Sequence, residues 1–206
     1  MHVELQEVSY SLPGRPLFTD LSHNFSGAKS VAIMGPSGSG KSTLLGLISG
    51  HLTPHKGTVR RVRGNLQDVT PAWIFQSSSL LPRRSALENS AVPSLMTGST
   101  KTAAVTRGHA ALTQVGLAHL AKVRVSKLSG GERQRVAVAG AIAAQSTLIL
   151  ADEPTASLDP YSRGQVVLAL KQAADSGSLV LVATHDSWVA ERCDESLRIH
   201  EGRLIG

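Results

Sequence analysis

The chain has 206 residues and a formal net charge of +6, and 41% of its residues are hydrophobic while 3% are aromatic. This length suffices for one compact core, and the scarcity of aromatic rings disfavours a nucleic-acid binder that works by stacking bases. The single cysteine, Cys193, excludes an internal disulfide, the usual mark of an oxidising compartment, and we expect an idle thiol.

The sequence also lacks the signals of membrane insertion. No run approaches the ~18–20 apolar residues that a membrane helix needs. The first ten residues alternate in polarity and carry acidic side chains, unlike a secretion signal. We therefore expect a cytoplasmic protein that reaches a membrane only by docking on another protein.

Two short runs of arginine are the strongest local concentrations of charge. They are Arg60, Arg61 and Arg63, and Arg83 with Arg84. Such runs can face phosphates or lipid headgroups, but most are ordinary solvated surface, which is the interpretation we favour.

Strand signals and turns alternate through the first third of the chain. Apolar residues at alternate positions open it, Pro13-Gly14 predicts a turn, and a short buried strand then runs into a glycine-rich loop and a helix. The expected elements are strands over residues 3–8, 21–25, 30–34, 57–62 and 72–75, and a helix over residues 41–49.

The rest of the chain begins with helical spacing over residues 86–121, interrupted by Pro93 and Gly98 as helix breakers. Strands then alternate with helices, which predicts an α/β fold with a mainly parallel sheet covered by helices. We expect one domain over residues 1–206, with a helical subdomain at about 86–135 inserted in its core. The further expected elements are helices over residues 130–144 and 160–174, and strands over residues 148–151, 179–183 and 197–200.

The glycine-rich loop satisfies the phosphate-loop pattern in its required context, after a strand and before a helix. Glycines let backbone N–H groups converge on phosphates, and the helix N-terminus adds a positive dipole. Lys41 would reach the β- and γ-phosphates, and Ser42 would bind Mg²⁺. The residues expected to bind nucleotide are Gly35, Pro36, Ser37, Gly38, Ser39, Gly40, Lys41, Ser42 and Thr43.

The loop by itself leaves ATPase, GTPase and kinase open. The sequence contains no Asn-Lys-x-Asp segment, which a guanine-specific GTPase would normally carry. This absence favours adenine as the base, and thus ATP as the nucleotide.

Two adjacent carboxylates follow the apolar strand at residues 148–151. Parallel sheets bind ligands at the carboxyl ends of their strands. Asp152 would hold Mg²⁺ through its water shell, and Glu153 would orient the attacking water and accept its proton. The alternative is that both acids only cap the helix that begins near Pro160.

The run Leu128-Ser129-Gly130-Gly131-Glu132 resembles the signature sequence of ATP-binding cassette (ABC) proteins. The resemblance extends to the next three residues, Arg133-Gln134-Arg135, and covers about residues 3–203. It implies the P-loop NTPase fold of the ABC type, with an antiparallel β subdomain and a small helical subdomain. It also implies a head-to-tail dimer, with itself or a related cassette, in which Ser129, Gly130 and Gly131 of one chain close on the γ-phosphate of ATP held by the other.

The same resemblance assigns roles to four more residues. Gln76 would contact Mg²⁺ and the lytic water, Asp159 would act across the dimer, and His185 would hold the γ-phosphate and the catalytic glutamate. Tyr10 is similar in position to the aromatic residue on which adenine stacks. Taken alone, these residues would be a loop glutamine, a helix cap, a structural histidine and a strand-end tyrosine.

One residue departs from the family's pattern. Gly140 stands where the family usually has arginine. A glycine inside a helix costs about 1 kcal/mol relative to alanine, so the departure bears on local stability rather than on the site's chemistry.

The segment from Phe75-Gln76 to Pro93 is similar to that of ATPases of the lipoprotein-releasing, macrolide-export and cell-division types. The resemblance implies a transmembrane permease or mechanotransmission subunit as partner, no nucleic acid, and a place at the inner face of the cell membrane. A groove beside residues 86–95 would receive a partner's helix. The alternatives are a soluble ABC ATPase acting on nucleic acid or ribosomes and, less favoured, a P-loop kinase.

Overall fold

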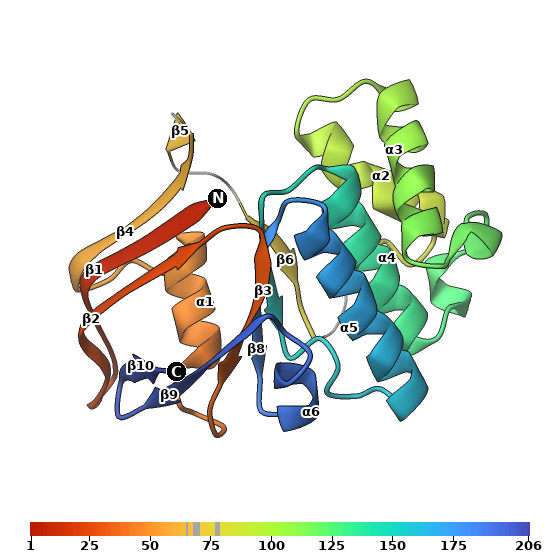
Figure 1. Ribbon diagram of the computed structural model, residues 1–206. Coiled ribbons are helices and arrows are strands. Elements are labelled where there is room, and N and C mark those ends of the chain that lie inside the picture. The colour runs from red at the N-terminus through yellow and green to blue at the C-terminus, as the bar shows by residue number, and fades with distance from the viewer. Residues whose placement is uncertain (65, 68–70, 77–78) are drawn as a thin grey trace.

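Two β-sheets, a central helix and a group of helices on one side make up the computed structural model, which describes residues 1–64, 66–67, 71–76 and 79–206 (Figure 1). The larger sheet has six strands in the order β10-β9-β3-β8-β7-β6, and the smaller has four in the order β2-β1-β4-β5. The expected α/β class and its two kinds of sheet are confirmed.

The six-stranded sheet is parallel from β9 to β6, and only β10 pairs antiparallel with its neighbour. Its central strands are buried along almost their whole length, as expected for strands covered on both faces. Its strands are β3 (Lys29–Met34), β6 (Ala72–Ile74), β7 (Leu148–Asp152), β8 (Leu179–Thr184), β9 (Glu195–His200) and β10 (Arg203–Ile205).

The four-stranded sheet is antiparallel and begins with the predicted hairpin. Leu12 pairs with Arg15 across the Pro13-Gly14 turn, which confirms the turn. A register shift follows, because Ser11 pairs with Pro16 while Tyr10 pairs with Phe18. Leu17 is therefore an extra residue in the second strand, a β-bulge. The strands are β1 (His2–Leu12), β2 (Arg15–Ser26), β4 (Lys56–Arg63) and β5 (Leu66–Gln67).

Two hydrophobic cores lie on opposite faces of the six-stranded sheet. Alternate side chains of a strand point to opposite faces, and β7 shows this division: Leu148 and Leu150 join one core, whereas Ile149 and Ala151 join the other. The first core contains α1 (Lys41–Ser49) and the antiparallel sheet. The second contains α4 (Gly130–Ala143) and α5 (Pro160–Asp175).

The helices α2 (Ala86–Met96) and α3 (Lys101–Gln114) pack against each other and against α4. Gly98 lies just past the end of α2, as predicted, but Pro93 does not break the helix and lies inside it. The expectation that Pro93 is a breaker is therefore wrong. The remaining short elements are the 3₁₀ helices η1 (Ala118–Leu120) and η2 (Val125–Lys127), and the helix α6 (Ser187–Ala190).

Pro93 is accommodated by close packing against the unusual glycine of α4. A Cβ at Gly140 would lie 3.2 Å from Cγ of Pro93 and 3.8 Å from the carbonyl oxygen of Asn89. That carbonyl would accept a hydrogen bond from residue 93 in a regular helix, but proline has no N–H to donate. Gly140 thus lets the proline-containing turn approach α4, which explains the departure from arginine in structural terms.

We expect Gly140→Arg to lower the free energy of unfolding by about 1–3 kcal/mol, because its β-carbon overpacks the contact with Pro93. Denaturant unfolding measures this change. Gly164→Ala in α5 is the matched control, because its Cβ would meet only Trp188 at an ordinary 3.7 Å. It should stabilise the protein by up to about 1 kcal/mol. Equal effects of the two substitutions would contradict the packing explanation.

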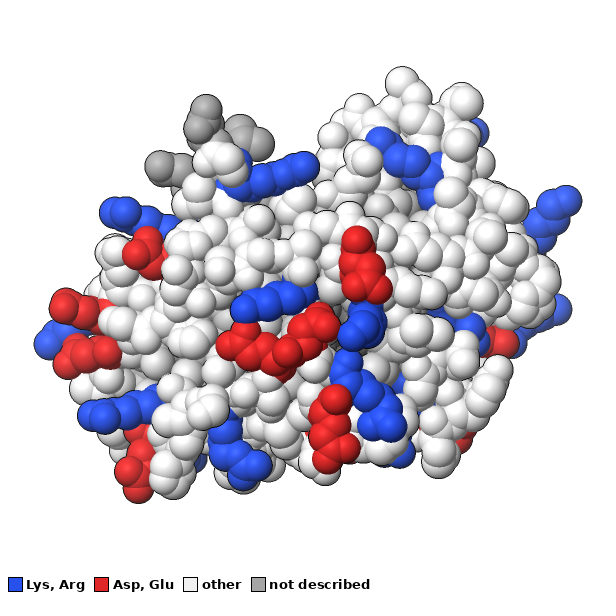
Figure 2. Space-filling view, viewed as in Figure 1, with Lys and Arg blue, Asp and Glu red and all other residues white. Residues whose placement is uncertain are grey.

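Charges of both signs are interspersed on the face of the molecule in Figure 2. Arg84 pairs with Glu88 at 2.9 Å, and Arg61 donates to the carbonyl oxygen of Ile48, so these arginines have structural partners. Burial raises the pKa of the Cys193 thiol to about 11, which keeps it protonated and unreactive. Within the described residues, no helix is long and apolar enough to cross a membrane.

Candidate functional site

The phosphate loop joins the end of β3 to the start of α1, at the carboxyl edge of the parallel sheet. Gly38 and Gly40 have φ of 78° and 101°, a region that favours glycine. A Cβ at Gly40 would also lie 2.9 Å from the ring of Phe18. No side chain caps α1 at Gly40, so the first N–H groups of the helix are open to an anion.

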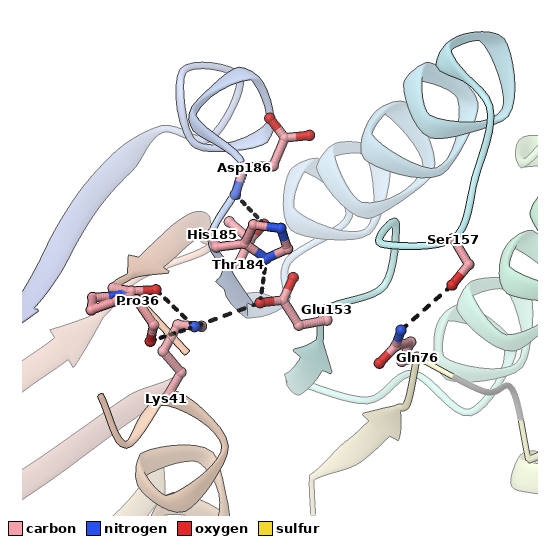
Figure 3. Close-up of polar contacts among 9 residues, drawn as sticks. Pro36, Lys41, Gln76, Glu153, Ser157, Thr184, His185 and Asp186 are labelled. Carbon is pink, nitrogen blue, oxygen red and sulfur yellow. Dashed lines mark hydrogen bonds and ion pairs between the residues drawn. The ribbon is translucent and has the colours of Figure 1, made fainter. Parts of the chain in front are cut away.

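Lys41 lies folded back over this loop. Its Nζ donates to the carbonyl oxygens of Gly35, at 2.8 Å, and Pro36, at 3.3 Å. The same Nζ lies 3.6 Å from Oε1 of Glu153 (Figure 3). The side chain is 8% exposed, so a cation is held at the centre of the loop by groups that an incoming phosphate would replace.

Glu153 follows β7 in a constrained backbone conformation. Its φ is 46°, and its N–H donates to the carbonyl oxygen of Ala183 at the end of β8. A non-glycine residue in this left-handed region costs about 1–3 kcal/mol and is concentrated at functional sites. Oε1 of Glu153 lies 3.0 Å from Nδ1 of His185 (Figure 3). The structure thus brings together three predicted residues, Lys41, Glu153 and His185.

The donor set at the carboxyl edge fits a magnesium ion. Oδ1 of Asp152 is buried and has no hydrogen-bond partner among the described residues, and the same holds for Oγ of Ser39. No group of three or more His, Cys, Asp or Glu gathers as a metal site in the described part of the chain. Mg²⁺ does not need one, since it takes one or two carboxylates together with substrate phosphates and water.

Gln76 lies apart from this cluster, as Figure 3 shows. Its Nε2 donates to Oγ of Ser157 at 3.5 Å. Both residues line a second cavity of about 250 Å³, together with Gly130 of α4 and Leu158. The structure therefore places Gln76 with Ser157 and the signature helix, rather than in contact with Lys41 or Glu153.

The predicted signature forms the start of α4. Ser129 caps the helix in a capping box with Glu132: Oγ accepts from the Glu132 N–H, and Oε2 of Glu132 accepts from the Ser129 N–H. A Cβ at Gly131 would lie 2.5 Å from Cβ of Ser162, and one at Gly130 would lie 3.1 Å from Leu158. Both glycines therefore also permit close packing of α4 on the start of α5.

Asp159 caps α5 directly before Pro160. Its Oδ1 accepts from the N–H of Ser162 at 3.0 Å, and hydrogen bonds from Ser162 lower the pKa of this carboxyl. In the single chain the residue therefore has the helix-capping role that its position predicts.

Tyr10 does not have the position that was expected for it. Its ring stacks on His55, with centroids 4.9 Å apart and planes at 23°. It packs against the core beneath the antiparallel sheet. The hollow beside the phosphate loop is instead lined by Leu12 and Leu17 of the hairpin.

Gln134 is a residue whose role was not predicted. It is 3% exposed, and its Nε2 donates to the carbonyl oxygens of Phe75, at 2.8 Å, and Gln76, at 2.7 Å. It ties the signature helix to the segment that carries Gln76. The sequence pattern that could have indicated this role is the helical spacing: Gln134 lies four positions before the buried Val138 and therefore on the buried face of α4.

A further contact links α5 to the residue after His185. Arg163 pairs with Asp186 at 2.7 Å and lies over the ring of Trp188. Asp186 in turn caps α6 by accepting from the Trp188 N–H. The backbone around His185 is therefore fixed by α5, which begins immediately after Asp159.

Comparison with known proteins gives a consistent result. The family model for the ABC transporter matches residues 18–156. The lipoprotein-releasing system ATP-binding protein LolD of Pseudomonas fluorescens is 40% identical over 187 residues, covering 85% of this chain and 82% of that protein. The macrolide export ATP-binding/permease protein MacB of Salmonella choleraesuis is 33% identical over 218 residues, covering 98% of this chain and 34% of that protein.

Solved structures of similar fold include a dimeric ATP-binding cassette in a post-hydrolysis state with ADP and phosphate bound. It is 29% identical, with a TM-score of 0.80, and covers 99% of this chain and 97% of its own. The structure of cbiO1 from Clostridium perfringens, part of an ABC transporter complex, is 25% identical, with a TM-score of 0.84. The match covers 99% of this chain and 86% of the cbiO1 chain. This chain therefore belongs to the ABC transporter family, as an ATP-binding and ATP-hydrolysing subunit.

Proposed function

We propose that the chain drives a membrane complex by closing and opening a head-to-tail dimer around ATP, acting as one nucleotide-binding domain over residues 1–206. The observation that carries this proposal is the separation of two phosphate-binding elements. The phosphate loop lines one hollow with Glu153, whereas the signature residue Gly130 lines a different cavity with Gln76. A complete site around ATP would therefore combine the phosphate loop of one chain with the signature of another.

Within one chain, the chemistry assigned to the cluster is in-line attack of water on the γ-phosphate. Glu153 would accept the water proton as the new P–O bond forms and the bond to ADP breaks. His185, at 3.0 Å from the same carboxylate, would hold Glu153 in position and donate to a γ-phosphate oxygen. Lys41 would transfer from its carbonyl partners to the β- and γ-phosphates, neutralising charge.

Mg²⁺ would be held by Ser42 and the unpartnered carboxylate Asp152, with Gln76 completing the set. Bound there, the ion would neutralise charge on the β- and γ-phosphate oxygens. Because Gln76 lies with Ser157 in this structure, its side chain would have to leave that contact to approach the ion. Gln134 holds the carbonyl oxygens of Phe75 and Gln76, so a displacement of this backbone would also reach the signature helix.

In the proposed dimer, the partner's Ser129, Gly130 and Gly131 would face the γ-phosphate. Ser129 is exposed at the N-terminus of α4, and a helix N-terminus favours anions. Asp159 caps the helix that packs on those glycines. It would therefore lie at the same interface and act across it.

The membrane partner would dock beside the end of β6, at the edge of the six-stranded sheet. A hollow of about 100 Å³ lies there between Phe75, Leu80 and Pro93. Phe75, a large apolar side chain that lines this hollow, is 41% exposed. An amphipathic helix of a membrane subunit would cover Phe75. Because Phe75 adjoins Gln76, docking would be coupled to nucleotide state.

The similarity to LolD and MacB favours a partner of the lipoprotein-releasing or macrolide-export type, at the inner face of the cell membrane. The candidates are a transmembrane permease and a mechanotransmission subunit. Nucleic acid is not an expected ligand, because the chain has few aromatic rings on which bases could stack.

The test is affinity purification of the Glu153→Gln variant with ATP from native membranes. Mass spectrometry would identify the co-purifying proteins, and a chain with Phe75→Glu in the same background is the control. Recovery of a membrane protein that is lost in the control supports the proposed docking site. Recovery of ribosomal or DNA-bound partners alone would overturn the membrane assignment in favour of a soluble ABC ATPase.

We expect Lys41→Ala to weaken ATP binding by about ten- to a hundred-fold, because it removes charge-assisted hydrogen bonds to phosphate. Titration calorimetry with Mg²⁺ and ATP measures the change. Lys29→Ala is the matched control, because it removes the same charge from the far end of β3, where Lys29 pairs with Glu195. Undiminished affinity in the Lys41 variant would contradict the assignment of the phosphate loop.

A further inference from the structure

The first turn of α5 contacts two functional regions of the same chain. On one side it packs against the signature, where a Cβ at Gly131 would lie 2.5 Å from Cβ of Ser162. On the other side, Nη1 of Arg163 lies 2.7 Å from Oδ2 of Asp186, the residue after His185. Ser162 and Arg163 are consecutive, and close-packed interiors transmit displacements. A shift of this turn at the signature would therefore reach Asp186 as well.

Asp186 fixes the backbone on which His185 stands. Its Oδ1 accepts from the N–H of Trp188 at 2.9 Å, and its own N–H donates to Oγ1 of the buried Thr184 at 3.1 Å (Figure 3). The side chain of His185 is 63% exposed, and its Nδ1 lies 3.0 Å from Oε1 of Glu153. With so little packing around the imidazole, its position depends on the backbone that Asp186 holds.

The guanidinium of Arg163 is only partly engaged by this pair. It gives one hydrogen bond to Asp186, and its Cζ lies 4.4 Å from the centroid of the Trp188 ring. Its Nε is buried and has no hydrogen-bond partner among the residues that the structure describes. A buried donor without a partner is unfavourable, and arginine and carboxylate frequently form two parallel hydrogen bonds. The contact therefore gains a hydrogen bond if the two groups move closer.

The far end of α5 is tied down separately. Nζ of Lys171 lies 3.1 Å from Oδ1 of Asp194, and Oδ2 of Asp194 accepts from the N–H and the hydroxyl of Ser30, near the start of β3. This second ion pair anchors the helix at the opposite edge of the sheet from the phosphate loop. A shift of the signature would thus act mainly on the first turn of α5.

We propose that Arg163 is a positioning residue that couples the signature of a chain to His185 of the same chain. When the signature closes on the ATP of the partner, the first turn of α5 moves with it, and Nε of Arg163 reaches Asp186. The backbone after β8 follows, and His185 takes its place beside Glu153 and the γ-phosphate of its own site. This inference rests on the head-to-tail dimer of the proposed function.

The emission of Trp188 tests the transmission, because Arg163 lies over its ring. The chain has two tryptophans, so Trp73→Phe leaves Trp188 as the single indole. In the Glu153→Gln protein with this substitution, ATP with Mg²⁺ should form the dimer and shift the emission. Adding Ser129→Arg should preserve ATP binding while it removes both the dimer and the shift.

Arg163→Gln in the same reporter protein shows whether the signal passes through this side chain. The dimer should still form with ATP, measured by light scattering, but without the shift in emission. A shift that survives Arg163→Gln would overturn the proposal, and so would unchanged emission in a parental reporter that is dimeric. If the reporter binds ATP and stays monomeric, the head-to-tail dimer itself fails, so the two failures are distinguishable.

Kinetics test the effect on His185 in the chain with its native Glu153. Arg163→Gln should lower kcat by about ten- to a hundred-fold, because a small misplacement of a catalytic group costs rate. The Kd of ATP should change by no more than about two-fold, because ground-state binding is retained. Asp186→Asn keeps the cap of α6, loses the ion pair and should have the same effect. The double variant should be no slower than the slower single variant, since the pair acts as a unit.

Lys171→Gln is the matched control, because it removes an ion pair from the same helix far from His185. Its kcat should stay within about two-fold of the parental value, as expected for an exposed pair. Arg163→Lys keeps the charge without the planar fork and should recover part of the rate. If the effects of Arg163→Gln and Asp186→Asn multiply, or if ATP affinity falls as far as kcat, the pair is merely structural and the proposal is wrong.

Discussion

Glu153→Gln is expected to reduce ATP turnover by about 10²–10⁴-fold, the usual contribution of a positioned general base. The amide is nearly the same size as the carboxylate and keeps the contact with His185, but it cannot accept the proton of the attacking water. Nucleotide binding should be retained. ATP would then stay intact between two chains, and the variant should accumulate as an ATP-dependent dimer.

Steady-state hydrolysis and size-exclusion chromatography with light scattering measure the two halves of this prediction. Asp175→Asn is the matched control, because it changes a carboxylate to an amide at the far end of α5. Turnover at the parental rate in the Glu153 variant would show that another group accepts the proton. If the Glu153→Gln protein hydrolyses ATP slowly but stays monomeric with ATP, slow hydrolysis does not trap a dimer, and this result would contradict a site shared between two chains.

The strands of the parallel sheet could be predicted because burial on both faces leaves a continuous apolar run. Residues 30–34 and 148–151 show this pattern, and each is a strand almost to its predicted limits. The three-residue edge strand β10 lacks such a run and was missed. Pro93 was misjudged because a local rule was overridden by packing, in which the absence of a side chain at Gly140 lets a proline-containing helix stay close to α4.

The positions of the candidate site residues differ in how far the sequence determines them. Asp152 ends a buried strand, Lys41 and Glu153 come after buried strands, and strand ends meet at one edge of a parallel sheet. The positive φ of Glu153 has no such signal, since it depends on a hydrogen bond to Ala183 of the neighbouring strand. The stacking of Tyr10 on His55 has no such signal either, since it is a contact between segments far apart in the sequence.

Ser129→Arg is the second substitution with a large expected effect. In the Glu153→Gln protein it should abolish the ATP-dependent dimer. The affinity of the monomer for ATP should change by no more than about two-fold. Ser129 caps a helix whose first residue, Gly130, lines a cavity separate from the phosphate loop, so an arginine at position 129 would not touch the nucleotide of its own chain. In the proposed dimer it would occupy the space of the partner's γ-phosphate.

The loss of a helix cap must be separated from the blocked interface, because removing this serine costs about 0.5–2 kcal/mol of helix stability. Ser129→Asn is the matched control, since asparagine caps a helix as well as serine does and remains small and neutral. It should dimerise. Ser129→Asp also keeps the cap, but places a negative charge toward the γ-phosphate and should block closure by repulsion.

Mixing two inactive chains gives the sharpest form of this prediction. A chain with Ser129→Arg keeps an intact phosphate loop, and a chain with Lys41→Ala keeps an intact signature. A head-to-tail pair of the two has one site with both intact halves and one with both damaged halves. The mixture should therefore recover ATP hydrolysis that neither chain shows alone, up to the activity of one site in each mixed dimer. If the mixture stays inactive while mixed dimers form, hydrolysis requires both sites. If Ser129→Arg alone dimerises and hydrolyses ATP normally, the signature does not face the nucleotide at all.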